Sequence, residues 1–201
     1  IYTLSLHDAL PILASPYNGI KLWNKNGMAY TSEQEAKIEE IYANKDYISV
    51  AWDKIGKLSV NEQIKGQYVD DLVDMVDIKE GLKVVIDCAS GAGSEISPLV
   101  FRKAGCEVTT LNSQPDGFFP GRNPEPNAEN LGNLMKTVVA IGADLGIDYD
   151  GDADRMITVD VEGNISPFDS LLAVISKEFD GDIVTTVDAG LCMDESVKGR
   201  V

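Results

Sequence analysis

Short apolar runs alternate with amphipathic stretches along the second half of the chain. A continuous apolar run bounded by turn residues is typical of a buried strand, whereas apolar residues three and four positions apart predict a helix. On this basis we expect strands at 83–87, 106–111, 144–147, 156–159 and 183–187, and helices at 95–104, 128–141 and 168–179. Strands that alternate with helices predict a layered α/β fold.

The first part of the chain carries clear turn and helix signals. Residues 20–23 alternate like a half-buried strand, and Asn26-Gly27 is a turn signal. Ser32 followed by Glu35 matches a capping box, which predicts a helix that continues to about Ala43.

A second amphipathic helix is expected over residues 61–75, before the strand-rich part begins. The side chains on its predicted apolar face are Ile64, Tyr68, Leu72 and Met75. Residues 78–81 are expected to form a linker, because the composition changes after them.

Composition and charge exclude several classes of function. The 201 residues are 44% hydrophobic, with 33 Asp+Glu against 17 Lys+Arg and a formal net charge of −16. This balance argues against a partner that is nucleic acid or an anionic membrane, since both require a positive surface, although a local cation can still hold an anionic substrate. No apolar run reaches the ~20 residues of a membrane span. Cys88, Cys106 and Cys192 are odd in number and widely spaced, which predicts reduced thiols in a cytoplasmic protein.

Residues 1–12 (IYTLSLHDALPI) differ in composition from the rest of the chain and contain its histidine, His7. They lack the basic start and cleavage site of a secretory signal. We expect them to be a foreign N-terminal extension and assign them no function; the alternative is a genuine strand with a turn at Pro11.

The chemistry is concentrated in residues 148–155 (DYDGDADR), which hold four carboxylates within seven residues after a predicted strand. Such closely spaced negative charges repel one another, so the folded loop must contain a cation. Asp150, Asp152 and Asp154 alternate and can face one point, and oxygen ligands suit Mg²⁺. Arg155 adds a planar fork that suits a phosphate beside the metal.

Three alternatives to a magnesium loop fit the sequence less well. An EF-hand needs Gly at its sixth position and Glu at its twelfth, which neither Asp148 nor Asp150 as first residue provides. A solvated acidic turn is the simplest alternative. A nucleotide site would depend on the Gly91-Ala92-Gly93 turn, but the third glycine of that fingerprint is replaced by Ile96, and a tight strand-to-helix turn is the better interpretation.

Several motifs in order resemble the α-D-phosphohexomutase family over about residues 14–201. The family's magnesium loop reads DGDxDR, which residues 150–155 match at every fixed position. The other matching segments are YNGIKLW at 17–23, DCASGAG at 87–93, PDGFFPGRNPEP at 115–126 and VTTVD at 184–188. The resemblance implies layered α/β/α domains with mixed sheets of the phosphohexomutase type. Within the family, the phosphoglucosamine mutase and phosphomannomutase branch is most similar.

The resemblance also implies roles for individual residues. Ser15 corresponds to the serine that carries the phosphoryl group, although the family's TASHNP segment is altered here, with Leu13 in place of Thr. Lys21 falls where the family has a lysine near the transferred group, a general acid or base. Residues 121–126 are interpreted as a surface or interdomain loop, in which Arg122 could touch substrate.

The implied domain order is a foreign extension at 1–12, the later part of domain I at 13–77, domain II with the metal loop at 78–180, and the start of domain III at 181–201. We expect a fragment of an Mg²⁺-dependent enzyme that moves a phosphoryl group between O6 and O1 of a hexose phosphate through a 1,6-bisphosphate. Glucosamine phosphate is the preferred substrate, and mannose or glucose phosphate the alternative. By itself the chain is expected to be inactive as a mutase. A non-catalytic divalent-cation-binding α/β fragment is the alternative from another class.

Overall fold

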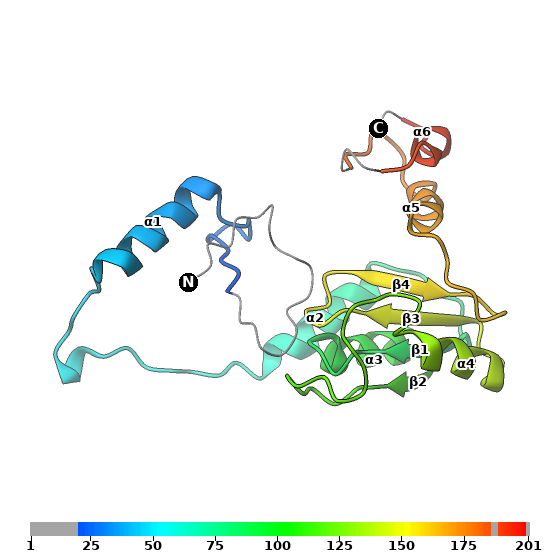
Figure 1. Ribbon diagram of the computed structural model, residues 1–201, viewed down its shortest axis with the longest axis horizontal. Coiled ribbons are helices and arrows are strands. Elements are labelled where there is room, and N and C mark those ends of the chain that lie inside the picture. Colours follow the sequence, from blue (N-terminus) through cyan, green and yellow to red (C-terminus); the bar gives the residue numbers. More distant parts are fainter. Residues whose placement is uncertain (1–19, 186–188, 200–201) are drawn as a thin grey trace. The chain divides into compact units, whose positions relative to one another are not determined.

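The computed structural model describes residues 20–185 and 189–199 of the chain (Figure 1). Contacts divide the chain into two compact units, residues 1–64 and 65–201. The division falls at the start of the second helix, whereas the sequence predicts a first domain that ends at residue 77.

The first unit contains one helix, α1 (Ser32–Asn44), and one short 3₁₀ turn, η1 (Trp52–Lys54), among its described residues. The capping box is present one residue earlier than expected. Thr31 accepts a hydrogen bond from the Gln34 amide, and the Gln34 side chain accepts one from the Thr31 amide at 2.9 Å. The segment TSEQE permits a capping box in either register, and the helix uses the earlier one.

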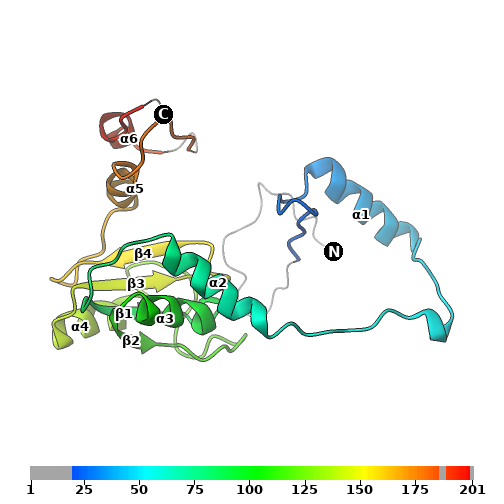
Figure 2. The same cartoon turned by 180° about the vertical axis from the view of Figure 1, so that it is seen from behind.

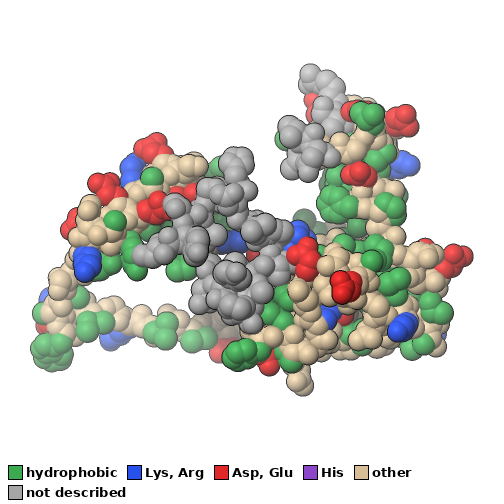
Figure 3. Space-filling model, in the orientation of Figure 1, with side chains coloured by type: hydrophobic (Ala, Val, Ile, Leu, Met, Phe, Trp, Pro, Cys, Tyr) green, Lys and Arg blue, Asp and Glu red, His purple; other side chains and the backbone are tan. Residues whose placement is uncertain are grey.

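The strand expected at residues 20–23 is absent as a regular element in the described part of this unit. A single antiparallel bridge joins Trp23 to Ala29, and the turn between them closes with Gly27 at φ +75°. The Asn24 side chain accepts hydrogen bonds from the amides of Asn26 and Met28, which stabilises the turn. The α1 helix buries no residue, and hydrophobic side chains remain on the surface of this unit (Figure 3).

The second unit is built on a four-stranded mixed sheet in the order β2-β1-β3-β4. The strands are β1 (Lys83–Asp87), β2 (Glu107–Leu111), β3 (Leu145–Tyr149) and β4 (Met156–Val159). The central strand β1 pairs in parallel with β2 and β3, whereas β4 runs antiparallel to β3. The carboxyl ends of β1, β2 and β3 therefore lie at one edge of the sheet, which is where α/β proteins place their binding sites.

Helices cover both faces of this sheet, which confirms the expected α/β layers. The α4 helix (Gly132–Ile141) packs on one face through Leu134 and Val138, against Val85 of the central strand. The opposite face of the sheet packs Val84, Ile86 and Ile147 against Phe101 of α3 (Gly93–Lys103), and Figure 2 shows α2 and α3 over this face.

The α2 helix (Gln63–Asp74) uses a different apolar face from the one predicted. Val69 is buried and Leu72 and Val73 are half-buried, while Ile64, Tyr68 and Met75 stay exposed. In this rotation two exposed ion pairs join α2 to α3, Lys65 with Glu95 and Asp70 with Lys103.

Other boundaries differ by a few residues. The α4 helix starts four residues later than expected, because the Asn127 side chain organises a turn by accepting from the Asn130 amide at 3.0 Å. The α5 helix (Phe168–Ser176) ends three residues early, and the short α6 (Cys192–Ser196), which contacts it, was not predicted. Residues 183–185 form no strand, and 186–188 lie outside the described residues. No helix in the described ranges is long and apolar enough to cross a membrane.

Candidate metal centre

Three loops meet at the carboxyl edge of the sheet. They follow β1 (residues 88–92), β2 (residues 112–127) and β3 (residues 150–155), and the strand order brings them together. The Ser90 amide donates to the Asn112 carbonyl at 2.7 Å, and the Ala92 amide donates to the Gly151 carbonyl at 3.0 Å. The loop after β1 thus holds the other two.

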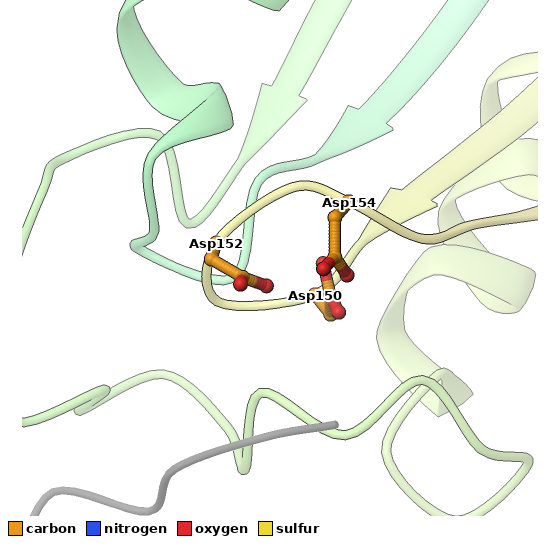
Figure 4. Close-up of side chains that lie close together, drawn as sticks. All are labelled: Asp150, Asp152 and Asp154. Atoms are coloured by element: carbon orange, nitrogen blue, oxygen red, sulfur yellow. The ribbon is translucent and has the colours of Figure 1, made fainter. Parts of the chain in front are cut away.

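The three alternating aspartates of the acidic loop converge as the sequence indicated. One carboxylate oxygen from each of Asp150, Asp152 and Asp154 lies within 4.8 Å of the others. Figure 4 shows the three side chains, all carried by the turn between β3 and β4, directed toward one another. Asp150 is buried at the base, and Asp152 and Asp154 are exposed. The loop reaches this shape with Ala153 in the left-handed region at φ 61°.

Arg155 lies beside these carboxylates. Its Nε donates to Asp150 at 2.8 Å, and its backbone amide donates to the same carboxylate at 3.3 Å. Its guanidinium is also paired more loosely with Asp154 at 3.8 Å and Glu125 at 3.7 Å. The side chain is about one-third exposed, so its position suits a group that enters from solvent.

The pKa of Asp150 is raised above its ordinary value. Burial is the largest cause, and the hydrogen bonds from Arg155 oppose it. The charges of Asp152 and Asp154 raise the pKa further. The three carboxylates therefore repel one another in the ionised state, and a bound cation would relieve that repulsion.

The backbones at Gly91 and Gly151 lie so close together that a side chain at position 91 would not fit. A Cβ on Gly91 would collide with the Gly151 carbonyl oxygen and lie 2.8 Å from its carbonyl carbon. The amide of Ala92, at the start of α3, is already bonded to that carbonyl. This geometry supports the tight-turn interpretation over a nucleotide site, because the acidic loop occupies the place where a phosphate would approach the glycines.

The side chain of Arg122 is buried, although its loop lies at the surface as expected, with Gly121 and Asn123 exposed. Its side chain is 6% exposed, and its Nε lies 3.2 Å from the Asp87 carboxylate at the end of β1. Its Nη2 donates to the Asp148 carboxylate and, at 3.0 Å, to the Tyr149 carbonyl. One of the four carboxylates of the acidic segment, Asp148, is therefore paired with this guanidinium and is not directed at the site formed by the other three.

Asp87 and Asp148, the two partners of Arg122, were not identified as site residues from the sequence. Asp87 also accepts from the Ala89 amide and the Asn112 side-chain amide at 3.0 Å. Burial raises the pKa of Asp148 to about 8; Arg122 lowers it, and nearby carboxylates raise it. A strand-terminal Asp followed by a glycine-rich turn was the available signal for Asp87.

A hollow of about 460 Å³ opens beside the acidic loop. Its lining comes from residues 90–92, Glu95, residues 115–117, Phe119 and Gly151. Glu95 and Asp116 make it acidic, so an anionic ligand would need a cation to enter it.

The remaining predicted site residues lie in the first unit or outside the described ranges. Lys21 is exposed in the first unit, shortly before the Trp23 bridge. Ser15 lies outside the described residues, as does the extension at 1–12. The structure thus brings together Asp150, Asp152, Asp154 and Arg155, and it leaves the roles of Ser15 and Lys21 as predictions.

Comparison with known proteins agrees with the family resemblance found in the sequence. Residues 66–163 match the family model described as phosphoglucomutase/phosphomannomutase, alpha/beta/alpha domain II. A protein of Methanobrevibacter smithii named "Probable phosphoglucosamine mutase" is 85% identical over 187 residues, which cover 93% of this chain and 42% of the relative. A protein of the same name from Methanothermobacter thermautotrophicus is 55% identical over 186 residues, 92% of this chain and 41% of the relative.

The fold has a counterpart among solved structures. A phosphoglucomutase/phosphomannomutase family protein from Burkholderia thailandensis superposes with a TM-score of 0.71 at 24% identity. The match covers 87% of this chain and 39% of that protein. The chain therefore spans about two fifths of the length of the proteins that it matches.

Proposed function

Since the chain belongs to the phosphohexomutase family, we propose that it is the part of a phosphoglucosamine mutase that supplies the metal loop. The reaction is the interconversion of glucosamine 6-phosphate and glucosamine 1-phosphate. The observation that carries this proposal is the convergence of Asp150, Asp152 and Asp154 within a chain 85% identical to a relative of that name.

The donor set fits Mg²⁺. Ligands of an octahedral Mg²⁺ site lie 2.0–2.1 Å from the ion, which places neighbouring oxygens about 3 Å and opposite ones about 4 Å apart. The three carboxylate oxygens, within 4.8 Å of one another, need only a small closure to reach that spacing. When bound, the cation would neutralise negative charge on the phosphoryl oxygens.

Three residues of this chain would serve the phosphoryl transfer. A hexose hydroxyl attacks the phosphorus of a phosphorylated Ser15; the new bond forms at the sugar oxygen and the bond to the serine oxygen breaks. The hydroxyl proton passes to a base, for which Lys21 is the candidate, and the serine oxygen regains a proton. The 1,6-bisphosphate then reorients and returns its other phosphoryl group to Ser15. Arg155, beside Asp150, would orient the phosphoryl oxygens through its planar fork.

The choice of glucosamine phosphate over mannose or glucose phosphate depends on the names of two relatives that are 85% and 55% identical to this chain. A cytoplasmic location is proposed from the pattern of three cysteines, all of which are free in the structure.

A chimera tests the proposal directly. The matching 187-residue segment of the Methanobrevibacter smithii relative would be replaced by that of this chain, and formation of glucosamine 1-phosphate measured in a coupled assay with a hexose 1,6-bisphosphate primer. We expect activity comparable to that of the parent, which is lost on Asp152→Asn. A folded chimera without activity, beside an active parent, would contradict the proposal. The activity of the chimera with mannose 1-phosphate and glucose 1-phosphate as competing substrates would show to which branch of the family it belongs.

A further inference from the structure

The buried guanidinium of Arg122 joins two strand ends at the edge of the sheet that carries the acidic loop. Its Nε lies 3.2 Å from Asp87 at the end of β1, and its Nη2 contacts Asp148 near the end of β3. Its Nη1 donates to the Asn123 carbonyl at 2.9 Å, which holds the loop that carries Arg122. The Arg122 side chain is 6% exposed, so its guanidinium lies within the protein and not in an open cleft.

One of these contacts reaches the backbone of the acidic loop itself. The Tyr149 carbonyl accepts from Nη2 at 3.0 Å, and Tyr149 immediately precedes Asp150. The acidic loop is held on its other side by the bond from the Ala92 amide to the Gly151 carbonyl. The peptide group that precedes Asp150 and the one that follows Gly151 are therefore both held by hydrogen bonds.

We propose that Arg122 is a positioning residue for the metal loop: its planar fork sets the backbone from which Asp150 reaches the ion. This inference rests on the proposed function, because it requires that the three aspartates bind a divalent cation. A lysine could not replace the arginine, since an ammonium cannot reach Asp87, Asp148 and the Tyr149 carbonyl in one fixed plane.

Charge and position predict opposite effects when Arg122 is removed. A positive charge beside a cation site opposes cation binding, so the electrostatic effect of its loss is tighter binding of Mg²⁺. Loss of a residue that holds the ligand loop has the reverse effect. Removal of groups that orient metal ligands weakens metal affinity by about 10–100-fold. The sign of the change therefore separates the two roles.

The experiment is an isothermal titration of the 201-residue chain with Mg²⁺ at pH 7, with circular dichroism to show that each variant is folded. The variants are Arg122→Gln and Arg122→Lys, and the matched control is Arg102→Gln on the exposed end of α3. We expect about 10–100-fold weaker binding for both variants at position 122 and an unchanged dissociation constant for the control.

Equal or tighter binding by folded Arg122→Gln, in a protein whose Asp152→Asn variant binds weakly, would overturn the positioning role and leave the metal site intact. If the wild type binds no Mg²⁺, the proposed metal site fails and this inference fails with it.

Removal of Arg122 leaves buried carboxylates unpaired and can unfold the protein. The double variant Arg122→Gln/Asp148→Asn replaces one of those carboxyl groups by an amide and is compared with Asp148→Asn alone. Weaker Mg²⁺ binding by the double variant supports the positioning role, and equal binding overturns it.

Discussion

Replacement of Gly91 by alanine should separate the loop after β1 from the acidic loop. The added Cβ would collide with the Gly151 carbonyl, which is backbone and cannot rotate away. Overpacking of this kind costs about 1–3 kcal/mol, and loss of the Ala92–Gly151 hydrogen bond costs about 0.5–1.5 kcal/mol more. Alanine reduces the entropy of the unfolded chain, which offsets about 0.4–1 kcal/mol. The net expected destabilisation is about 0.5–4 kcal/mol.

A matched control has the opposite sign. Gly66 lies inside α2, and a Cβ added there would have no atom within 4 Å, so Gly66→Ala should stabilise the helix by about 0.5–1 kcal/mol. Urea unfolding should be followed by circular dichroism, because both tryptophans, Trp23 and Trp52, lie in the first unit and do not report on the sheet. If Gly91→Ala is as stable as Gly66→Ala, the two loops do not approach each other this closely.

Two further predictions concern titration and phosphorylation. Without divalent ions, the free energy of unfolding should fall as the pH rises from about 4 to about 8 and level off above that. Burial raises the pKa of Asp148 from 3.8 to about 8, so the stabilisation by the neutral form is fully present below about pH 4 and is lost by the time the pH has passed the folded-state pKa of about 8. Asp148→Asn should flatten this dependence in urea midpoints, and an unchanged pH slope would count against it. In the chimera with the Methanobrevibacter smithii relative, Ser15→Ala should abolish transfer of labelled phosphate from a hexose 1,6-bisphosphate to the protein, as detected by mass spectrometry. The control Ser59→Ala, which changes an exposed serine of the same unit, should leave the transfer intact. Label on the Ser15→Ala chimera would exclude Ser15 as the phosphorylated residue.

Local features of this protein could be predicted from the sequence. The strands at 83–87 and 156–159 lie where their apolar runs placed them, because short buried strands between turn residues are determined by their own composition. The convergence of Asp150, Asp152 and Asp154 was also predictable, since alternating residues on one short loop need no distant segment to bring them together.

Features that depend on strand order could not be predicted. Arg122 is 26 residues from Asp148 in sequence, and it reaches both Asp148 and Asp87 only because β1 and β3 are neighbours in the sheet. The prediction of which face of α2 is buried was wrong for a similar reason. The helix α2 meets α3, 30 or more residues away in sequence, and in that packing Val69 is buried and Tyr68 is exposed.

The central claim, that the acidic loop is a magnesium site, is tested most directly by calorimetric titration of the chain with Mg²⁺ before and after Asp152→Asn. Asp71→Asn, which removes the same charge from the exposed surface of α2, is the control. We predict one Mg²⁺ per wild-type chain, with weak affinity because Mg²⁺ gives up its waters reluctantly. Asp152→Asn should bind at least about tenfold more weakly, and Asp71→Asn should match the wild type. Identical titrations for the wild type and Asp152→Asn, or no binding by the wild type, would contradict the account.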